Sequence, residues 1–90
     1  MQMAAHELKS DIEFIVRDLK RNDFELTGHA RKRMQERCVS RGDIVNVSQT
    51  FRKIEKQDSG KIKIMGLDRS GDDLTIICVY ESGTLIVTVY

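Results

Sequence analysis

Apolar residues with helical spacing mark the first part of the chain. They are spaced three or four apart, as one face of a helix requires, at Ile12, Ile15, Val16 and Leu19. Ser10 and Glu13 have the spacing of a capping box, so the helix is expected to begin at Ser10, or earlier near Ala4. The turn formers at residues 22–23 are expected to end it.

Two shorter helices are predicted after a brief alternation at residues 24–26, which is typical of a short strand. Thr27 is a suitable N-cap for a helix that runs to about Arg37. Its buried stripe is expected to be formed by residues four apart, namely Ala30, Met34 and Cys38. Ser40 and Asp43 form a second capping box, which opens a third helix that contains Ile44, Val45 and Val47.

After Phe51 the apolar period changes from about 3.6 to two. Segments rich in Ile, Val and Thr cover residues 61–67, 74–80 and 85–90, with a further strand expected at 52–56. Serine and glycine pairs at 59–60, 70–72 and 82–83 supply the turns. The pattern predicts one α+β domain over residues 1–90, with two to three N-terminal helices on one face of a three- to four-stranded antiparallel sheet. Its parts are an N-terminal helix (1–23), basic helices (24–50) and an antiparallel meander (51–90).

Composition excludes several classes of protein. With 40% hydrophobic and 32% charged residues the chain is globular, and no run of about 18 apolar residues is present to cross a membrane. The N-terminal residues do not resemble a secretory signal, so we expect a cytoplasmic protein. Cys38 and Cys78 are expected to be reduced, buried thiols, and His6 and His29 lack metal-ligand spacing. We therefore expect no metal and no cofactor.

The net charge of +1 conceals a strong local excess of basic residues. Residues 27–56 contain eight basic and three acidic side chains, whereas the segments on both sides are each net acidic. Local clustering, not the total, determines whether a surface attracts a polyanion. The middle third of the chain is therefore the place to look for a binding surface.

Within that segment, His29, Arg33 and Arg37 are spaced four apart, so all three lie along one side of the predicted helix. Arginine offers a planar fork that fits phosphate, and imidazole exchanges a proton near neutral pH. The alternative is an ordinary solvated helix face, in which Glu36 pairs with Lys32. Spacing alone does not decide between these readings.

The residues Thr27, His29, Ala30, Arg33, Met34 and Arg37, followed by Val39-Ser40, resemble the T-x-H-A-x-x-R-M-x-x-R-G-I-S signature of a family of small uncharacterised bacterial domains. The resemblance extends over about residues 24–90, including the final apolar strand. Such domains resemble RelE/barnase-like ribonucleases of toxin–antitoxin modules. Cys38 stands where the family commonly has glycine, which predicts an altered turn after the helix.

The resemblance implies a metal-independent endoribonuclease toxin that drives the ribose 2′-hydroxyl onto the adjacent phosphate. It implies RNA as substrate, either messenger or transfer RNA, free or bound to a ribosome, and a cognate antitoxin as partner. His29 would then act as base or acid, while Arg33 and Arg37 would hold the phosphate. Fold alone does not establish activity, so a non-catalytic RNA- or protein-binding module stays an alternative.

The last strand and several lysines and arginines extend this candidate site. In a regular strand Ile86, Thr88 and Tyr90 share one face, and the apolar residues Leu85, Val87 and Val89 are expected to face the helices. Thr88 would orient a phosphate oxygen, and Tyr90 would stack on a base or act as an acid. Candidate RNA-binding residues are Arg31, Lys32, Arg41, Lys61 and Lys63, with Tyr80 as an addition. A solvated or edge-protecting role is the alternative for the lysines.

A third hypothesis is a protein-interaction domain, because few aromatic residues are available for stacking on bases. The phenylalanines Phe14, Phe24 and Phe51 are expected in the core. The oligomeric state is not fixed by the sequence, although a last strand at the edge of the sheet would allow pairing between chains.

Overall fold

The computed structural model describes the backbone of residues 3–90 and the side chains of residues 11–90. The elements, in chain order, are α1 (Met3–Lys20), β1 (Phe24–Leu26), α2 (Gly28–Arg37), α3 (Arg41–Thr50), β2 (Lys53–Lys56), the short 3-10 turn η1 (Asp58–Gly60), β3 (Ile62–Leu67), β4 (Asp73–Tyr80) and β5 (Thr84–Val89). α1 begins at Met3, so Ser10 lies inside the helix and is not its cap. The earlier of the two predicted starts is therefore correct. No helix among the described residues has the length and apolar character needed to cross a membrane.

The sheet has five strands in the order β1-β5-β4-β3-β2. β2, β3, β4 and β5 form the expected antiparallel meander, but β1 pairs in parallel with β5, from Phe24 beside Thr84 to Leu26 beside Ile86. The prediction of a three- to four-stranded antiparallel sheet is therefore confirmed only in part, because β1 adds a fifth strand and a parallel pairing. The α+β class is confirmed. β5 lies inside the sheet, so the open edges belong to β1 and β2.

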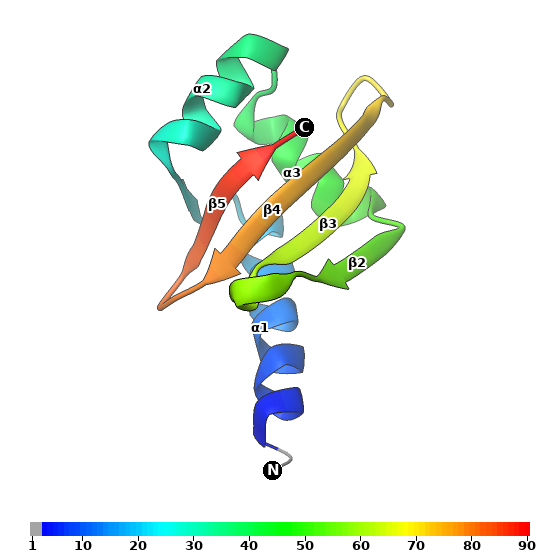
Figure 1. The fold of residues 1–90 in the computed structure, drawn as a ribbon. Helices are drawn as coiled ribbons and strands as arrows, with labels where there is room; N and C mark the ends of the chain where they lie inside the picture. Colours follow the sequence, from blue (N-terminus) through cyan, green and yellow to red (C-terminus); the bar gives the residue numbers. More distant parts are fainter. Residues whose placement is uncertain (1–2) are drawn as a thin grey trace.

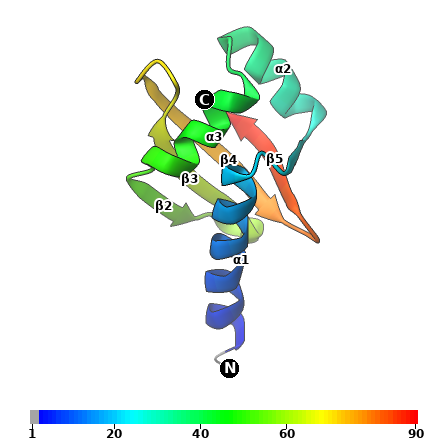
Figure 2. The same cartoon turned by 180° about the vertical axis from the view of Figure 1, so that it is seen from behind.

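Two helices cover one face of this sheet and leave the other uncovered. Figures 1 and 2 show α1 and α3 lying across the same face, with α2 beside β5 and the first half of α1 projecting past the sheet. The core lies between these helices and the sheet. Its fully buried side chains come from α1, α3 and the strands and include Ile15, Leu19, Ile44, Val47, Ile64, Ile76 and Ile86. Gly66 allows α3 to approach β3 closely, because a Cβ there would lie 3.1 Å from Val47 and from the backbone of Phe51.

A β-bulge in β5 changes which residues face the helices. The pairing with β4 shifts register between Ile77 and Cys78, so that Ile77 pairs with Thr88 while Cys78 pairs with Ile86. Ile86 is consequently buried on the covered face, and Leu85 lies on the uncovered one. The prediction for these two residues was wrong because it assumed an unbroken period of two. Thr88 nevertheless lies on the uncovered face, as expected.

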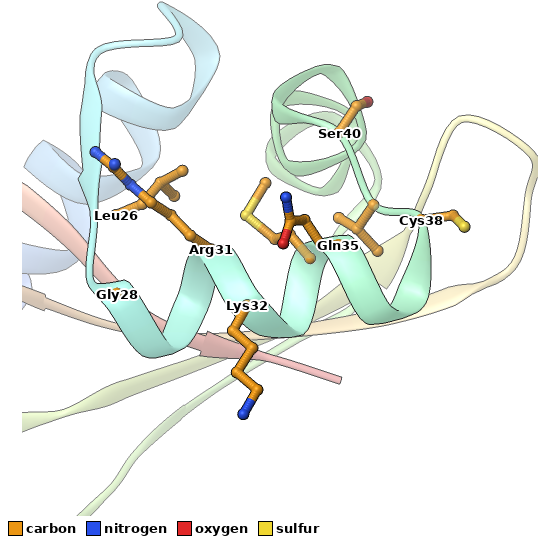
Figure 3. A pocket seen from close by; sticks show the side chains of 9 residues that line it. Leu26, Gly28, Arg31, Lys32, Gln35, Cys38 and Ser40 are labelled. Atoms are coloured by element: carbon orange, nitrogen blue, oxygen red, sulfur yellow. The ribbon is translucent and has the colours of Figure 1, made fainter.

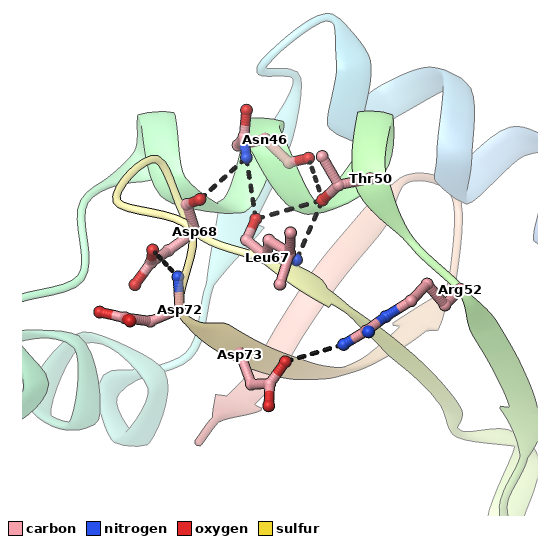
Figure 4. A network of polar contacts seen from close by, with 7 residues as sticks. All are labelled: Asn46, Thr50, Arg52, Leu67, Asp68, Asp72 and Asp73. Carbon is pink, nitrogen blue, oxygen red and sulfur yellow. Dashed lines mark hydrogen bonds and ion pairs between the residues drawn. The ribbon is translucent and has the colours of Figure 1, made fainter.

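Polar contacts fix α1 and α3 on the sheet. Thr84 donates a buried hydrogen bond of 2.9 Å to the carboxylate of Asp18, which joins the end of α1 to the start of β5. On the same face, at the end of β3, Asn46 donates to the carbonyl oxygens of Leu67 and Asp68, each at 3.0 Å, and the Thr50 hydroxyl accepts from the Leu67 amide (Figure 4). These contacts hold the α3 helix against the loop between β3 and β4.

The two cysteines differ in environment. Cys78 is buried in β4, as predicted, and burial raises the pKa of its thiol to about 12. Cys38 is exposed and does not belong to the buried stripe of α2, which consists of Ala30 and Met34. The helix ends at Arg37, and Cys38 turns into the left-handed region at φ 55° and ψ 41°. The prediction that Cys38 is buried was wrong because the turn rotates its side chain away from the helix stripe.

The aromatic side chains also depart from expectation. Phe24 is buried, but Phe14 and Phe51 are exposed over 38% and 39% of their surface. Phe14 lies against Tyr80, with 5.3 Å between ring centroids, on the covered side of the sheet. Tyr80 therefore does not extend the uncovered face, contrary to the prediction.

Candidate functional site

Thr27 holds α2 beside the second half of β5. Its hydroxyl accepts a hydrogen bond of 2.9 Å from the Ala30 amide, as an N-cap does, and donates one of 2.8 Å to the carbonyl oxygen of Val87. Its amide donates to the Ile86 carbonyl oxygen at 3.0 Å. The same residue thus starts the helix and attaches it to the bulge in β5. The cap was predictable from the sequence; the bond to Val87, sixty residues away, was not.

The two flanks of α2 face different surroundings. Ala30 and Met34 are buried against the body of the domain. On one flank, Arg31 and Gln35 line a pocket of about 720 Å³ next to the start of α3 (Figure 3). At about 100° per residue, His29, Arg33 and Arg37 fall on the opposite flank. Because α3 lies on the covered side of the sheet, this second flank is the one turned toward the uncovered side.

The row of three is accessible to solvent. His29 and Arg37 are exposed, and the side chain of Arg33 is 39% exposed. The guanidinium of Arg33 approaches Glu36 only to 4.0 Å, a distance at which a surface ion pair contributes little. Among the side chains of residues 11–90, His29 and Arg37 have no ion-pair partner. All three are therefore available to an anionic ligand.

The register of the sheet brings Lys63, Thr88 and Tyr90 together on the uncovered face. Ile77 of β4 pairs with Lys63 of β3 on one side and with Thr88 of β5 on the other, so the side chains of Lys63, Ile77 and Thr88 form a row across the three strands. Tyr90 is joined to Thr75 by two backbone hydrogen bonds of 2.7 and 2.9 Å, and the ammonium of Lys63 lies 5.8 Å from the centre of its ring. We call His29, Arg33, Arg37, Lys63, Thr88 and Tyr90 the α2–β5 site.

The other candidate RNA-binding residues lie outside this site. Arg31 and Lys32 both line the pocket on the opposite flank of α2, where their side chains extend in different directions (Figure 3). Arg41 donates hydrogen bonds to the backbone oxygens of Asn22 and Phe24 and lies 4.0 Å above the Phe24 ring, so its guanidinium supports the fold. Lys61 is exposed at the start of β3, beyond Lys63.

The described residues of the site do not form a cluster of metal ligands. Within the described part of the chain, no three His, Cys, Asp or Glu side chains lie close enough to share a metal ion. What the site does contain is one imidazole, two guanidiniums, an ammonium and two hydroxyls. Such groups bind phosphate oxygens and transfer protons.

The sequence patterns did not identify the apolar part of the uncovered face. This part consists of four half-buried side chains, Met65, Ile77, Val79 and Leu85. Their alternation with fully buried neighbours is visible in β3 and β4, but it does not show which face the helices leave uncovered. Which face stays uncovered depends on where the helices pack, and this is known only from the structure.

Fold and site together define a small α+β domain with a cationic helix beside an uncovered sheet face. A family described as "Domain of unknown function (DUF4258)" matches residues 26–90, and the chain belongs to this family. The matched segment contains the whole α2–β5 site, whereas α1 precedes it. No protein with a curated description and no solved structure matches the chain.

Proposed function

We propose that the chain is a metal-independent endoribonuclease that binds single-stranded RNA at the α2–β5 site. The observation that carries the proposal is the attachment of α2 to β5 through Thr27. This attachment supports the proposal because it fixes α2 beside the half of β5 that contains Thr88, and His29, Arg33 and Arg37 lie on the flank of α2 turned toward the uncovered sheet. A positively charged surface with an aromatic ring beside it is a common way to bind single-stranded nucleic acid. The RelE-like resemblance of the sequence supports the same class of reaction.

In the proposed reaction, the ribose 2′-oxygen attacks the adjacent phosphorus and the bond from phosphorus to the 5′-oxygen breaks. The proton of the 2′-hydroxyl passes to a base, and an acid protonates the leaving 5′-oxygen. His29 serves in one of these two roles. Arg33 and Arg37 stabilise the negative charge that gathers on the phosphorane oxygens. The products are a 2′,3′-cyclic phosphate and a 5′-hydroxyl end.

Residues on the sheet complete the proposed site. The hydroxyl of Thr88 donates to a non-bridging phosphate oxygen, and Lys63 adds positive charge two strands away. Tyr90 offers an exposed ring, 42% accessible, whose backbone is held by Thr75. An aromatic ring in this position stacks on a nucleobase next to the bound phosphate. We further propose that the domain acts in the cytoplasm as a toxin, neutralised by a cognate antitoxin.

One observation favours a non-catalytic RNA-binding module as a second candidate. Among the described side chains, none donates to or accepts a hydrogen bond from His29, so nothing in the free protein orients its imidazole. Catalytic histidines are usually oriented by a second group. Binding and cleavage therefore have to be measured separately.

The test uses purified protein, a fluorescent single-stranded RNA and an excess of EDTA. We expect binding by fluorescence anisotropy, and cleavage products that carry a 2′,3′-cyclic phosphate. Arg33→Ala should weaken RNA binding about tenfold and reduce the slope of log affinity against log salt by about one. Arg31→Ala is the matched control, because it removes the same charge from the opposite flank of the same helix. It should change the affinity about twofold or less.

His29→Ala separates the two candidates. Loss of cleavage with retained binding supports the ribonuclease, and expression toxicity should disappear in the same variant. If the wild-type protein binds RNA of mixed sequence but does not cleave it, the second candidate, a non-catalytic RNA-binding module, is supported instead. Equal effects of Arg31→Ala and Arg33→Ala would show that the α2–β5 site is wrongly placed.

A further inference from the structure

A second surface lies at the opposite edge of the sheet, away from the α2–β5 site. There a groove of about 550 Å³ is formed by α1, the end of α3 and β2. Its floor is apolar and consists of Ile12, Val16, Phe51 and Ile54. Phe51 is 39% exposed, although it is a large aromatic side chain. An apolar surface of this kind beside charged residues is typical of a protein-interaction site.

The strand that borders this groove is an open edge. β2 is bonded to β3 on one side, and no described strand pairs with its other side. Its outer backbone groups are therefore available to a further strand. Ile54 belongs to β2 and its side chain lines the groove, so a strand added here would direct alternate side chains onto the same apolar floor.

The charge around the groove is mainly positive. Lys20 and Arg21 rim it at the end of α1, opposed only by Glu13, and neither has an ion-pair partner among residues 11–90. Lys53 and Lys56 add positive charge along β2 itself, although Lys53 pairs with Glu55 at 2.9 Å. The rim therefore favours a partner that carries carboxylates.

From these observations we infer that the α1–β2 groove binds an acidic, extended segment of another protein, which pairs with β2 as an additional strand. Apolar side chains on one face of that segment lie on Phe51 and Ile54, and its carboxylates are attracted by the positive charge around the groove. Backbone hydrogen bonds supply affinity, and the groove supplies selection for alternating apolar residues. RNA lacks such side chains and is not the occupant.

The probe is a peptide of alternating glutamate and valine, about nine residues long, so that at ~3.4 Å per residue it spans β2 and both ends. Binding is measured by anisotropy, and the contact is mapped by amide chemical shifts. We expect changes in β2 and along the groove, and none in α2. A second peptide carries N-methyl groups on alternate residues, which remove the donors needed for strand pairing. It should bind at least about tenfold more weakly.

Two exposed phenylalanines provide a matched pair of variants. Phe51→Glu places a negative charge on the groove floor and should weaken peptide binding about tenfold. Phe14→Glu makes the same change at nearly equal exposure, at a residue that does not line the groove, and should alter peptide binding about twofold or less. Circular dichroism confirms that both variants are folded. Neither variant touches the α2–β5 site, so their RNA binding should equal that of the wild type.

Several outcomes would overturn the inference. Equal binding of the methylated peptide, or induction of helix in the peptide, would exclude strand pairing. Competition of the peptide by RNA would show that the groove is a nucleic-acid site. Dimerisation of the chain that Phe51→Glu abolishes would make a second copy the occupant. Since Arg33→Ala leaves this groove unchanged, failure here and failure of the ribonuclease proposal are distinguishable.

Discussion

At the scale of single residues, the turn after α2 shows that a helix can end in the left-handed region without glycine. The Cys38 amide donates to the Gln35 carbonyl oxygen at 3.3 Å, and the Val39 amide donates to Met34 at 2.8 Å. These bonds satisfy carbonyl groups at the helix end and are the usual reason for a left-handed cap. The altered turn that we expected from Cys38 is therefore absent: the residue adopts the conformation that glycine would.

This geometry predicts that Cys38→Gly stabilises the domain. A residue with a Cβ loses about 1 kcal/mol in the left-handed conformation, which glycine avoids, and the greater freedom of glycine in the unfolded chain offsets part of the gain. We expect a net increase of about 0.5 kcal/mol in the free energy of unfolding, measured by urea denaturation. Cys38→Ala is the control and should give no such increase. Lower stability of the glycine variant would contradict the assignment of the cap.

At the scale of elements, Asp43 joins the start of α3 to the loop between β3 and β4. Its carboxylate accepts hydrogen bonds from the Ser40 amide at 2.8 Å and from the Arg69 amide at 2.9 Å. Partial burial would raise the pKa of Asp43, but these hydrogen bonds and the charge of Arg69 outweigh it and hold the pKa below the ordinary value of 3.8. The ionised form is therefore the one that stabilises the fold.

The stability that Asp43 provides is present above pH 4 and is lost as the pH falls through its lowered folded-state pKa. Asp43→Ala should reduce the free energy of unfolding by about 1–2 kcal/mol at pH 7, because it removes both a cap and a loop anchor. The difference in the free energy of unfolding between this variant and the wild type should be smaller at pH 3 than at pH 7. Asp72→Ala, in the same loop, is the control and should be close to neutral. A difference that is independent of pH would contradict the role of the ionised carboxylate.

The helices and strands also show how much of the fold could be predicted from the sequence alone. Periodicity and capping residues identified α2, α3 and the meander, and the row on α2 follows from spacing alone. The place of β1 could not be found in this way, because a parallel pairing with β5 joins residues sixty positions apart. The bulge at Val87 was hidden for a related reason, since Val87, Thr88 and Val89 fit an unbroken strand equally well. Both features depend on tertiary contacts.

At the scale of the whole molecule, the positive charge of residues 27–56 divides between the two edges of the sheet. Arg33 and Arg37 lie on α2 beside β5, whereas Lys53 and Lys56 lie on β2. Three strand spacings separate β5 from β2, which corresponds to about 14 Å. The local excess seen in the sequence is thus two cationic surfaces, not one. This division is the reason that separate ligands for the two edges are proposed.

The two thiols report on the stability of the whole domain, because one is exposed and the other lies in the central strand β4. Thiolate is the reactive form, and Cys78 has a thiol pKa of about 12 and no exposed surface. With a thiol reagent at pH 8, Cys38 should react rapidly. Cys78 should react only through global opening, about a thousandfold or more slowly. The labelling rate of Cys78 is measured in a Cys38→Ser variant, in which Cys78 is the remaining thiol. Adding Asp43→Ala to this variant should accelerate the labelling of Cys78, because it lowers the stability of the domain. Rapid labelling of Cys78 in native buffer would contradict its place in the core.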